Sequence, residues 1–111
     1  MKHTQKEKYI LIQSESNSLT SFFEEFKKNY EKFKNEHLIL DLLEVTINGF
    51  EDLSLFYELS KAHKSRDYSF VIVTKSVEID QLPDDFVVVP TLHEAEDTID
   101  IEAIERDIRL S

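Results

Sequence analysis

The chain has 111 residues, of which 41% are apolar and 11% aromatic, a composition that excludes an intrinsically disordered protein. Its net charge of −10 excludes nucleic acid and anionic membranes as expected partners, because both repel a surface of the same sign. The absence of cysteine excludes a disulfide framework and thiolate metal sites, and it fits a reducing compartment. We therefore expect one domain, residues 1–111, that buries its core without covalent staples.

The sequence contains no signal for export or membrane insertion. Its apolar runs are far shorter than the ~20 residues that a membrane-spanning helix needs. The basic N-terminal stretch is followed by an apolar run that is too short for the core of a signal peptide. We therefore expect a cytoplasmic protein.

The charge is distributed unevenly along the chain. Residues 1–37 hold seven lysines against six acids, whereas residues 78–107 hold eleven acids and one basic residue, Arg106. Two interpretations follow: a solvated acidic face that keeps a small protein soluble, or a surface that attracts a protein partner with a basic surface.

The first half of the chain predicts a strand, a helix and a second strand. Tyr9 to Ile12 is a short apolar run bounded by polar residues, as in a buried strand. The next apolar residues recur at the spacing of an amphipathic helix; they are Leu19, Phe22, Phe23, Phe26, Tyr30 and Phe33. Residues 38–43 form the second predicted strand. Within it, Asp41 must point out of the core, near a sheet edge or a helix terminus, because an unpaired buried acid is costly.

The only glycine, Gly49, marks the start of a second predicted helix. Apolar residues repeat at helical spacing from there to Ala62. We expect Asn48 to be its N-cap, while Glu51 and Asp52 lie in the first turn, where negative charge meets the positive end of the helix dipole.

Two further strands and a last helix follow. Residues 69–74 form a continuous β-branched run that is typical of a strand buried on both faces, and residues 86–90 form a fourth strand. Thr91 and Glu94 have the spacing of a capping box. We expect the last helix to break at residues 98–100, with Asp100 capping a second piece. The apolar side of that piece consists of Ile101, Ile104 and Ile108.

The order of these elements, β-α-β-α-β-β-α, predicts an α/β fold. Strands that alternate with helices favour a mostly parallel or mixed sheet of four or five strands, packed against amphipathic helices in two or three layers.

The residue patterns do not predict catalysis. The sequence contains no phosphate-binding glycine motif and no nucleophile elbow. Its histidines share no metal-ligand spacing; they are His3, His37, His63 and His93. Adjacent acids occur in loops and helix caps, as composition alone would produce. We therefore expect a protein that is not an enzyme and that uses no metal or cofactor.

The middle of the sequence, LILDLLEVTINGFEDLSLFYELSKAHKSRDYSFVIVT, resembles STAS domains, the anti-sigma factor antagonist family. That family has a strand of the form LDLS-x-V, an apolar residue, a D-S-S-G-like turn that opens a helix, and a strand of the form F-x-I-V. Here residues 40–47 fit the first strand, residues 51–64 the helix and residues 70–74 the later strand. PTLHEAED resembles the family's last strand and helix, so the resemblance covers residues 8–97 and implies a STAS-like fold.

The sequence departs from the family at the position that matters for regulation. Switchable members carry a serine or threonine at the start of this helix, where this chain has Glu51, and the glycine that follows is replaced by Asp52. Ser54 is the nearest hydroxyl, about one turn into the helix between two leucines. A fixed carboxylate at Glu51 then either stands in the place of a phosphate or compensates the helix dipole, as acids commonly do.

The resemblance implies a non-catalytic regulatory module that binds another protein and is not switched by serine phosphorylation. The alternatives are a small enzyme that uses the acids at helix N-termini, or a structural subunit. Helix N-termini at the end of a sheet present oriented donors, and an exposed aromatic ring is a common anchor for a partner. The predicted partner-binding residues are Asn48, Gly49, Phe50, Glu51, Asp52 and Ser54. The sequence leaves open whether Phe50 is such an anchor or part of the core.

Overall fold

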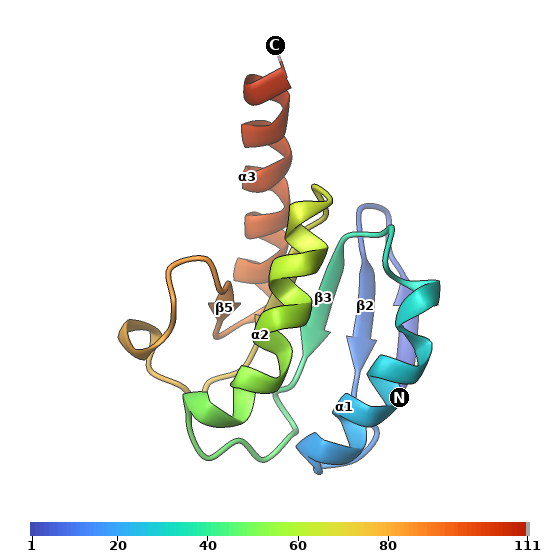
Figure 1. Ribbon diagram of the computed structural model, residues 1–111, viewed down its shortest axis with the longest axis vertical. Coiled ribbons are helices and arrows are strands. Elements are labelled where there is room, and N and C mark those ends of the chain that lie inside the picture. Colours follow the sequence, from blue (N-terminus) through green and yellow to red (C-terminus); the bar gives the residue numbers. More distant parts are fainter. Residues whose placement is uncertain (111) are drawn as a thin grey trace.

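The structure is a computed structural model that describes residues 1–110, except for the side chains of Ile79 and Leu110. Within this range the chain folds into a mixed five-stranded sheet with three α-helices (Figure 1). The elements in chain order are β1 (Lys2–Gln5), β2 (Ile10–Gln13), α1 (Leu19–Asn29), the 3₁₀ helix η1 (Tyr30–Lys32), β3 (Leu38–Asp41), α2 (Phe50–Ser65), β4 (Phe70–Val73), the 3₁₀ helix η2 (Ile79–Gln81), β5 (Val88–Val89) and α3 (Leu92–Leu110).

The strands lie in the order β1-β2-β3-β4-β5, so that chain neighbours are also neighbours in the sheet. β1 is antiparallel to β2, and the other pairs are parallel. This confirms the predicted α/β fold with a mostly parallel, mixed sheet. The strand pattern of the sequence does not reveal β1, because this edge strand is largely exposed and carries no apolar alternation.

The sheet is covered by helices on each face, which gives three layers (Figure 1). In β3, Leu38 and Leu40 face α1 and α2, whereas Ile39 faces α3. β4 is buried along its whole length, as its continuous apolar sequence predicts. The helices α1 and α2 share the larger core, and α3 closes a smaller one with Ala95 and Ile99.

Phe26 is the centre of the larger core. Its side chain is fully buried, and its ring centroid lies 5.7 to 6.3 Å from the rings of five other aromatic residues. These partners come from α1, η1 and the segment after it, α2 and β4; they are Phe22, Tyr30, Phe33, Phe56 and Phe70. The aromatic stripe predicted at helical spacing is therefore a core stripe, and it joins both helices of this face to the sheet.

The last helix differs from the prediction. The Thr91 half of the expected capping box is present, since the Glu94 amide donates to Thr91 Oγ1 at 3.1 Å, and the same hydroxyl donates to Glu94 Oε2 at 2.9 Å. The expected break at residues 98–100 is wrong, because α3 runs unbroken from Leu92 to Leu110. Thr98 turns its hydroxyl to the Glu94 carbonyl at 2.9 Å, and Ile99 is buried against the sheet. Tertiary packing thus overrides the weak helix propensity of this stretch.

His63 in α2 is a fully buried titratable group. Its Nδ1 lies 2.6 Å from the Tyr30 hydroxyl and its Nε2 lies 2.7 Å from the Glu36 carbonyl. The Tyr30 hydroxyl accepts a hydrogen bond from Arg66, so it is left to donate to Nδ1, and Nε2–H donates to the carbonyl. Burial of the ring is the main cause that lowers the pKa of His63 to about 4, and the nearby Arg66 charge contributes to the same shift. The neutral imidazole therefore joins α2, η1 and the loop before β3.

Acidification should weaken the fold through this histidine. Between pH 6.5 and about pH 4 the unfolded chain takes up a proton at His63 and the folded chain does not, so stability falls as the pH falls. The loss should reach about 3 kcal/mol. Urea unfolding across this pH range should show a steeper decline for the wild type than for His63→Gln, which removes the titration. If the free energy of unfolding falls equally with pH in the two proteins, His63 is not the group that causes the decline.

Candidate functional site

The predicted site lies where β3 leads into α2, at the carboxyl ends of the parallel strands. In open α/β sheets this end is where ligands and partners commonly bind. Gly49 immediately precedes α2 with φ 158° and ψ 176°, a conformation that is nearly restricted to glycine. A Cβ added to it would meet no atom within 4 Å. The backbone angle, and not a lack of space, is therefore what requires glycine here.

The expected N-cap, Asn48, is wrong. Gly49 occupies the cap position, and no side chain accepts from the first amides of α2. The Asp52 carboxylate instead reaches back past the cap residue and accepts the backbone N–H of Asn48 at 2.9 Å. A glycine cap costs only a few tenths of a kcal/mol relative to asparagine, so the backbone turn decides the position.

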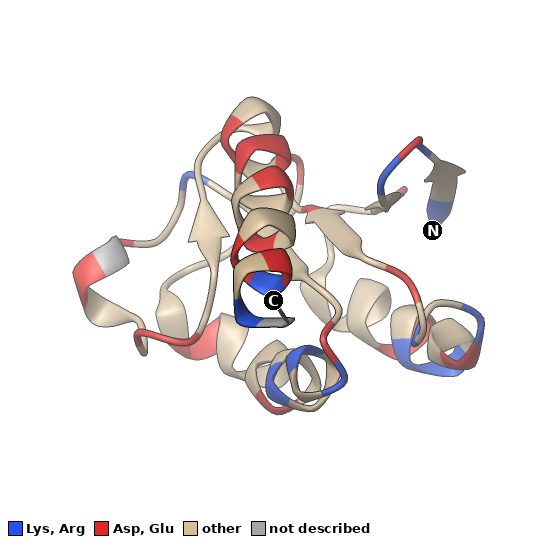
Figure 2. Cartoon of the chain, turned by 90° about the horizontal axis from the view of Figure 1, so that it is seen from above, with Lys and Arg blue, Asp and Glu red and all other residues tan. Residues whose placement is uncertain are grey.

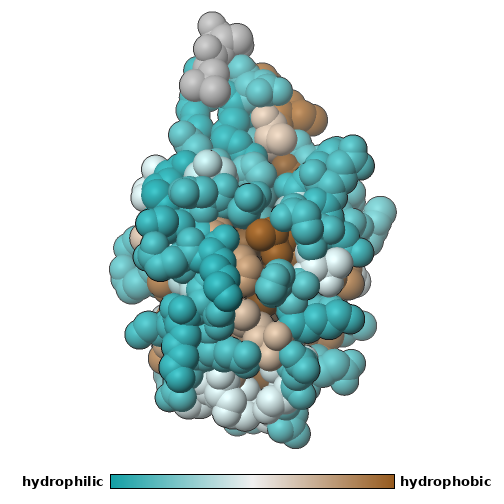
Figure 3. Space-filling model, turned by 90° about the vertical axis from the view of Figure 1, so that its right-hand side faces the viewer, coloured by the Kyte–Doolittle hydropathy of each residue, from teal (hydrophilic) through white to brown (hydrophobic). Residues whose placement is uncertain are grey.

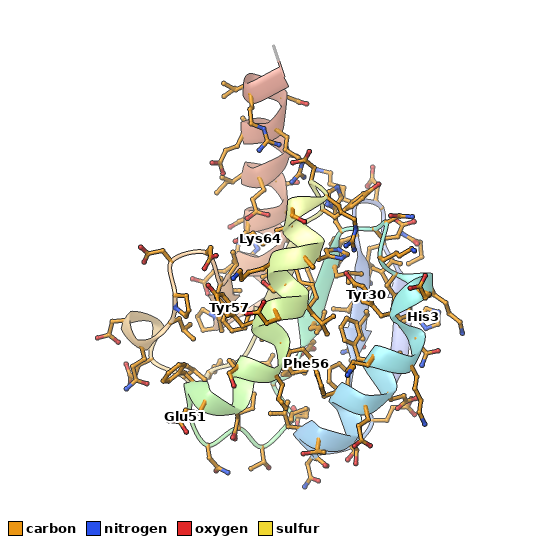
Figure 4. The ribbon with its side chains drawn as sticks, in the orientation of Figure 1. His3, Tyr30, Glu51, Phe56, Tyr57 and Lys64 are labelled. Atoms are coloured by element: carbon orange, nitrogen blue, oxygen red, sulfur yellow. The ribbon has the colours of Figure 1, made fainter. Side chains whose placement is uncertain are left out.

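The first turn of α2 exposes both charge and apolar surface. Glu51 is exposed and extends from the lower end of α2 (Figure 4). Phe50 is 36% exposed, which favours the anchor interpretation over the core one. Leu55, 45% exposed on the same helix, lines a pocket together with Glu51 and Asp52 and adds to this surface. Apolar side chains rimmed by carboxylates are therefore presented at this end of the sheet.

Two shallow pockets flank the predicted residues. The first, of about 410 Å³, lies toward α1, and the second, of about 450 Å³, lies toward η2. Asn48, Glu51 and Asp52 line both pockets, and Gly49 and Phe50 line the second. The structure thus brings five of the six predicted residues together.

Ser54 lines neither pocket. Its side chain is exposed, and its hydroxyl donates to the Glu51 carbonyl at 2.6 Å. The sequence placed Ser54 between two apolar positions, but only Leu53 is buried and Leu55 is exposed. The hydroxyl is therefore reachable from solvent without unwinding the helix.

Sequence reasoning missed the residues that other loops contribute to the first pocket. The loop between β2 and α1 supplies Asn17 and Ser18, and the loop after β3 supplies Thr46. The Thr46 amide donates to the Asn17 carbonyl at 3.0 Å, which joins the two loops. The polar run SESNS is visible in the sequence, yet only the parallel pairing of β2 with β3 places it beside α2.

Asp41 is the last residue of β3, and its side chain is partly exposed, as expected. Its Oδ1 accepts the Leu43 amide at 3.0 Å and its Oδ2 accepts the Gln13 side chain at 3.1 Å. These bonds offset the cost of placing an acid in an apolar strand. Asp41 therefore shapes the turn that leads toward α2.

No protein-family model matches the sequence, and no curated protein matches it. Across residues 1–110, acidic and histidine side chains nowhere form a group of three that could hold a metal ion. The helices of this described range also lack the length and apolar character needed to cross a membrane.

Gly49→Ala should destabilise the fold by about 1–3 kcal/mol, because alanine is strained at this backbone conformation. The free energy of unfolding from urea titration measures the effect. Ser54→Ala is the matched control in the same helix, and it should change stability by less than about 0.5 kcal/mol because the side chain is exposed. If Gly49→Ala is as stable as Ser54→Ala, the backbone conformation at residue 49 does not require glycine.

Proposed function

We propose that the chain is a non-catalytic, cytoplasmic protein-interaction module of regulatory function, similar to the anti-sigma factor antagonists of the STAS family. The observation that carries the proposal is the exposed apolar surface of Phe50 and Leu55 beside the carboxylate of Glu51. An aromatic anchor with a charged rim is the usual anatomy of a protein-binding surface. The resemblance of residues 8–97 to STAS domains supports the same assignment.

The partner is a protein with a basic surface. Glu51 and Asp52 place negative charge at the rim, and the net charge of −10 adds a long-range field of the same sign. Complementary charge raises the association rate and selects the partner, while the buried anchor supplies most of the affinity. The same field opposes nucleic acid and anionic lipid.

Reversal of the rim charge should weaken partner binding. Tagged wild-type protein should recover a reproducible partner from extract of its native cell, and Glu51→Lys with Asp52→Lys should lower the partner's affinity at least about tenfold. Glu58→Lys is the matched control, since its exposed carboxylate lies further along the same helix.

Circular dichroism must show that all the variants are folded. Unchanged affinity in the folded double variant would place the binding surface elsewhere. Turnover in a broad hydrolase or phosphatase screen, with no partner recovered, would favour an enzyme instead.

The junction should not act as a phosphorylation switch. Glu51 holds the acceptor position, and a phosphate on Ser54 would bring nearly two negative charges close to Glu51 and Asp52. Mass spectrometry of the protein from its native cell should therefore find Ser54 unmodified. Stoichiometric phosphate on Ser54 would overturn this prediction and restore the switch.

A further inference from the structure

The C-terminal half of α3 exposes a second apolar surface. Ile101 is 56% exposed, Ile104 is 58% exposed and Ile108 continues the row at 69%. The spacing i, i+3, i+7 puts the three side chains on one side of the helix. Ala95 and Ile99, which pack on the sheet, lie on the opposite side. α3 therefore has a buried apolar face in its first half and an exposed one in its second.

The exposed face lies on a part of α3 that extends past the sheet. A 19-residue helix is about 28 Å long, whereas a four-residue strand spans about 13 Å. Figure 1 shows the C-terminal half of α3 above the ends of the strands, and Figure 3 shows apolar surface on this projecting part. Ion pairs hold the helix in place, from Lys8 to Asp100 near the middle of α3 at 2.8 Å and from Asp67 to Arg109 near its C-terminal end at 2.6 Å.

A groove runs between this half of α3 and the upper end of the sheet. Its volume is about 730 Å³, and Ile104 lies on its wall, so the groove and the exposed isoleucines form a continuous surface. The other walls come from the β1–β2 turn and the loop before β3, with Gln5, Glu36 and His37.

The rim of this surface is acidic. Glu7, Glu36 and Asp107 line the groove, and none of their carboxylates forms an ion pair within residues 1–110. The two basic residues of the groove have partners of their own, since Lys8 pairs with Asp100 at 2.8 Å and Arg106 donates to the Ser69 hydroxyl at 3.4 Å. Asp97 and Glu105 flank the isoleucines on α3, and Figure 2 shows the acids along this helix in red.

Charge decides between the possible occupants. A second copy of the chain would bring Glu105 and Asp107 of one helix near the same acids of the other, and like charges at an interface are costly. An anionic membrane is repelled for the same reason. An apolar row with an acidic rim is complementary to an amphipathic helix with apolar residues on one face and lysine or arginine beside them.

We propose that the groove and the Ile101–Ile104 face of α3 form a docking site for a basic amphipathic helix of a protein partner. The apolar side of that helix packs on the isoleucines, and its basic residues meet Glu7, Glu36 and Asp107. This site lies at the amino ends of the parallel strands, whereas the Glu51 surface lies at their carboxyl ends. The module then has two separate surfaces and joins two protein segments.

The test uses a synthetic helical peptide with leucines at i, i+3, i+4 and i+7 and lysines at the other positions. Isothermal titration should show binding to the whole chain, weakened by raising salt from about 0.1 to about 0.5 M. Ile101→Gln with Ile104→Gln should lower the affinity about tenfold or more, because glutamine keeps the helix but removes the apolar contact. A scrambled peptide of the same composition should bind with an affinity as low as that of the double variant.

Ala62→Gln is the control, because Ala62 is an exposed residue of α2 that lies outside both proposed surfaces. It should leave the peptide affinity unchanged. The proposal is overturned if the peptide does not bind, if Ile101→Gln with Ile104→Gln binds as the wild type does, or if Ala62→Gln is the weaker binder. A dimer in sedimentation velocity that Ile104→Gln dissociates would identify a second copy as the occupant and also overturn it.

Discussion

The contacts of Phe26 fix the arrangement of this fold. Its ring touches aromatic side chains of α1, η1, α2 and β4, so one buried side chain joins both helices of one face to the middle of the sheet. With α1 and α2 held side by side, the loops that precede them meet, as the hydrogen bond from Thr46 to Asn17 shows. The surface at the start of α2 depends on this packing more than on any bond within the surface itself.

The core on the other face of the sheet is smaller, and α3 contributes to it mainly through its first half, with Ala95 and Ile99. Beyond that point polar links replace apolar packing, since Ser69 donates to Glu102 at 2.5 Å and Arg109 pairs with Asp67. These links hold the helix in position without covering Ile101 and Ile104. An ordered helix that keeps large apolar side chains in water is unusual, and it is the reason for assigning a partner to it.

The sequence predicted those elements whose apolar residues recur at a regular helical or strand spacing. The two aromatic-rich helices, the buried strand β4 and the α/β class follow from apolar spacing alone, because each element buries one continuous face. The edge strand β1 has no such face, and the continuity of α3 comes from the burial of Ile99, which local propensity cannot show. At the candidate site the turn at Gly49 was predictable from residue type. Its neighbours Asn17 and Ser18 were not, because strand pairing brings them there.

The same physical pattern occurs at both ends of the sheet. At the start of α2, Phe50 and Leu55 stand beside Glu51, and on α3 the isoleucines stand beside Glu105 and Asp107. In the functions proposed for these surfaces, each combination favours a basic partner with apolar side chains over a second copy of the acidic chain. Because Glu51 stands where switchable STAS domains carry a serine or threonine, the attraction proposed for the α2 end needs no kinase. Under the proposed function, control of the module comes from the supply of its partners and from competition between them.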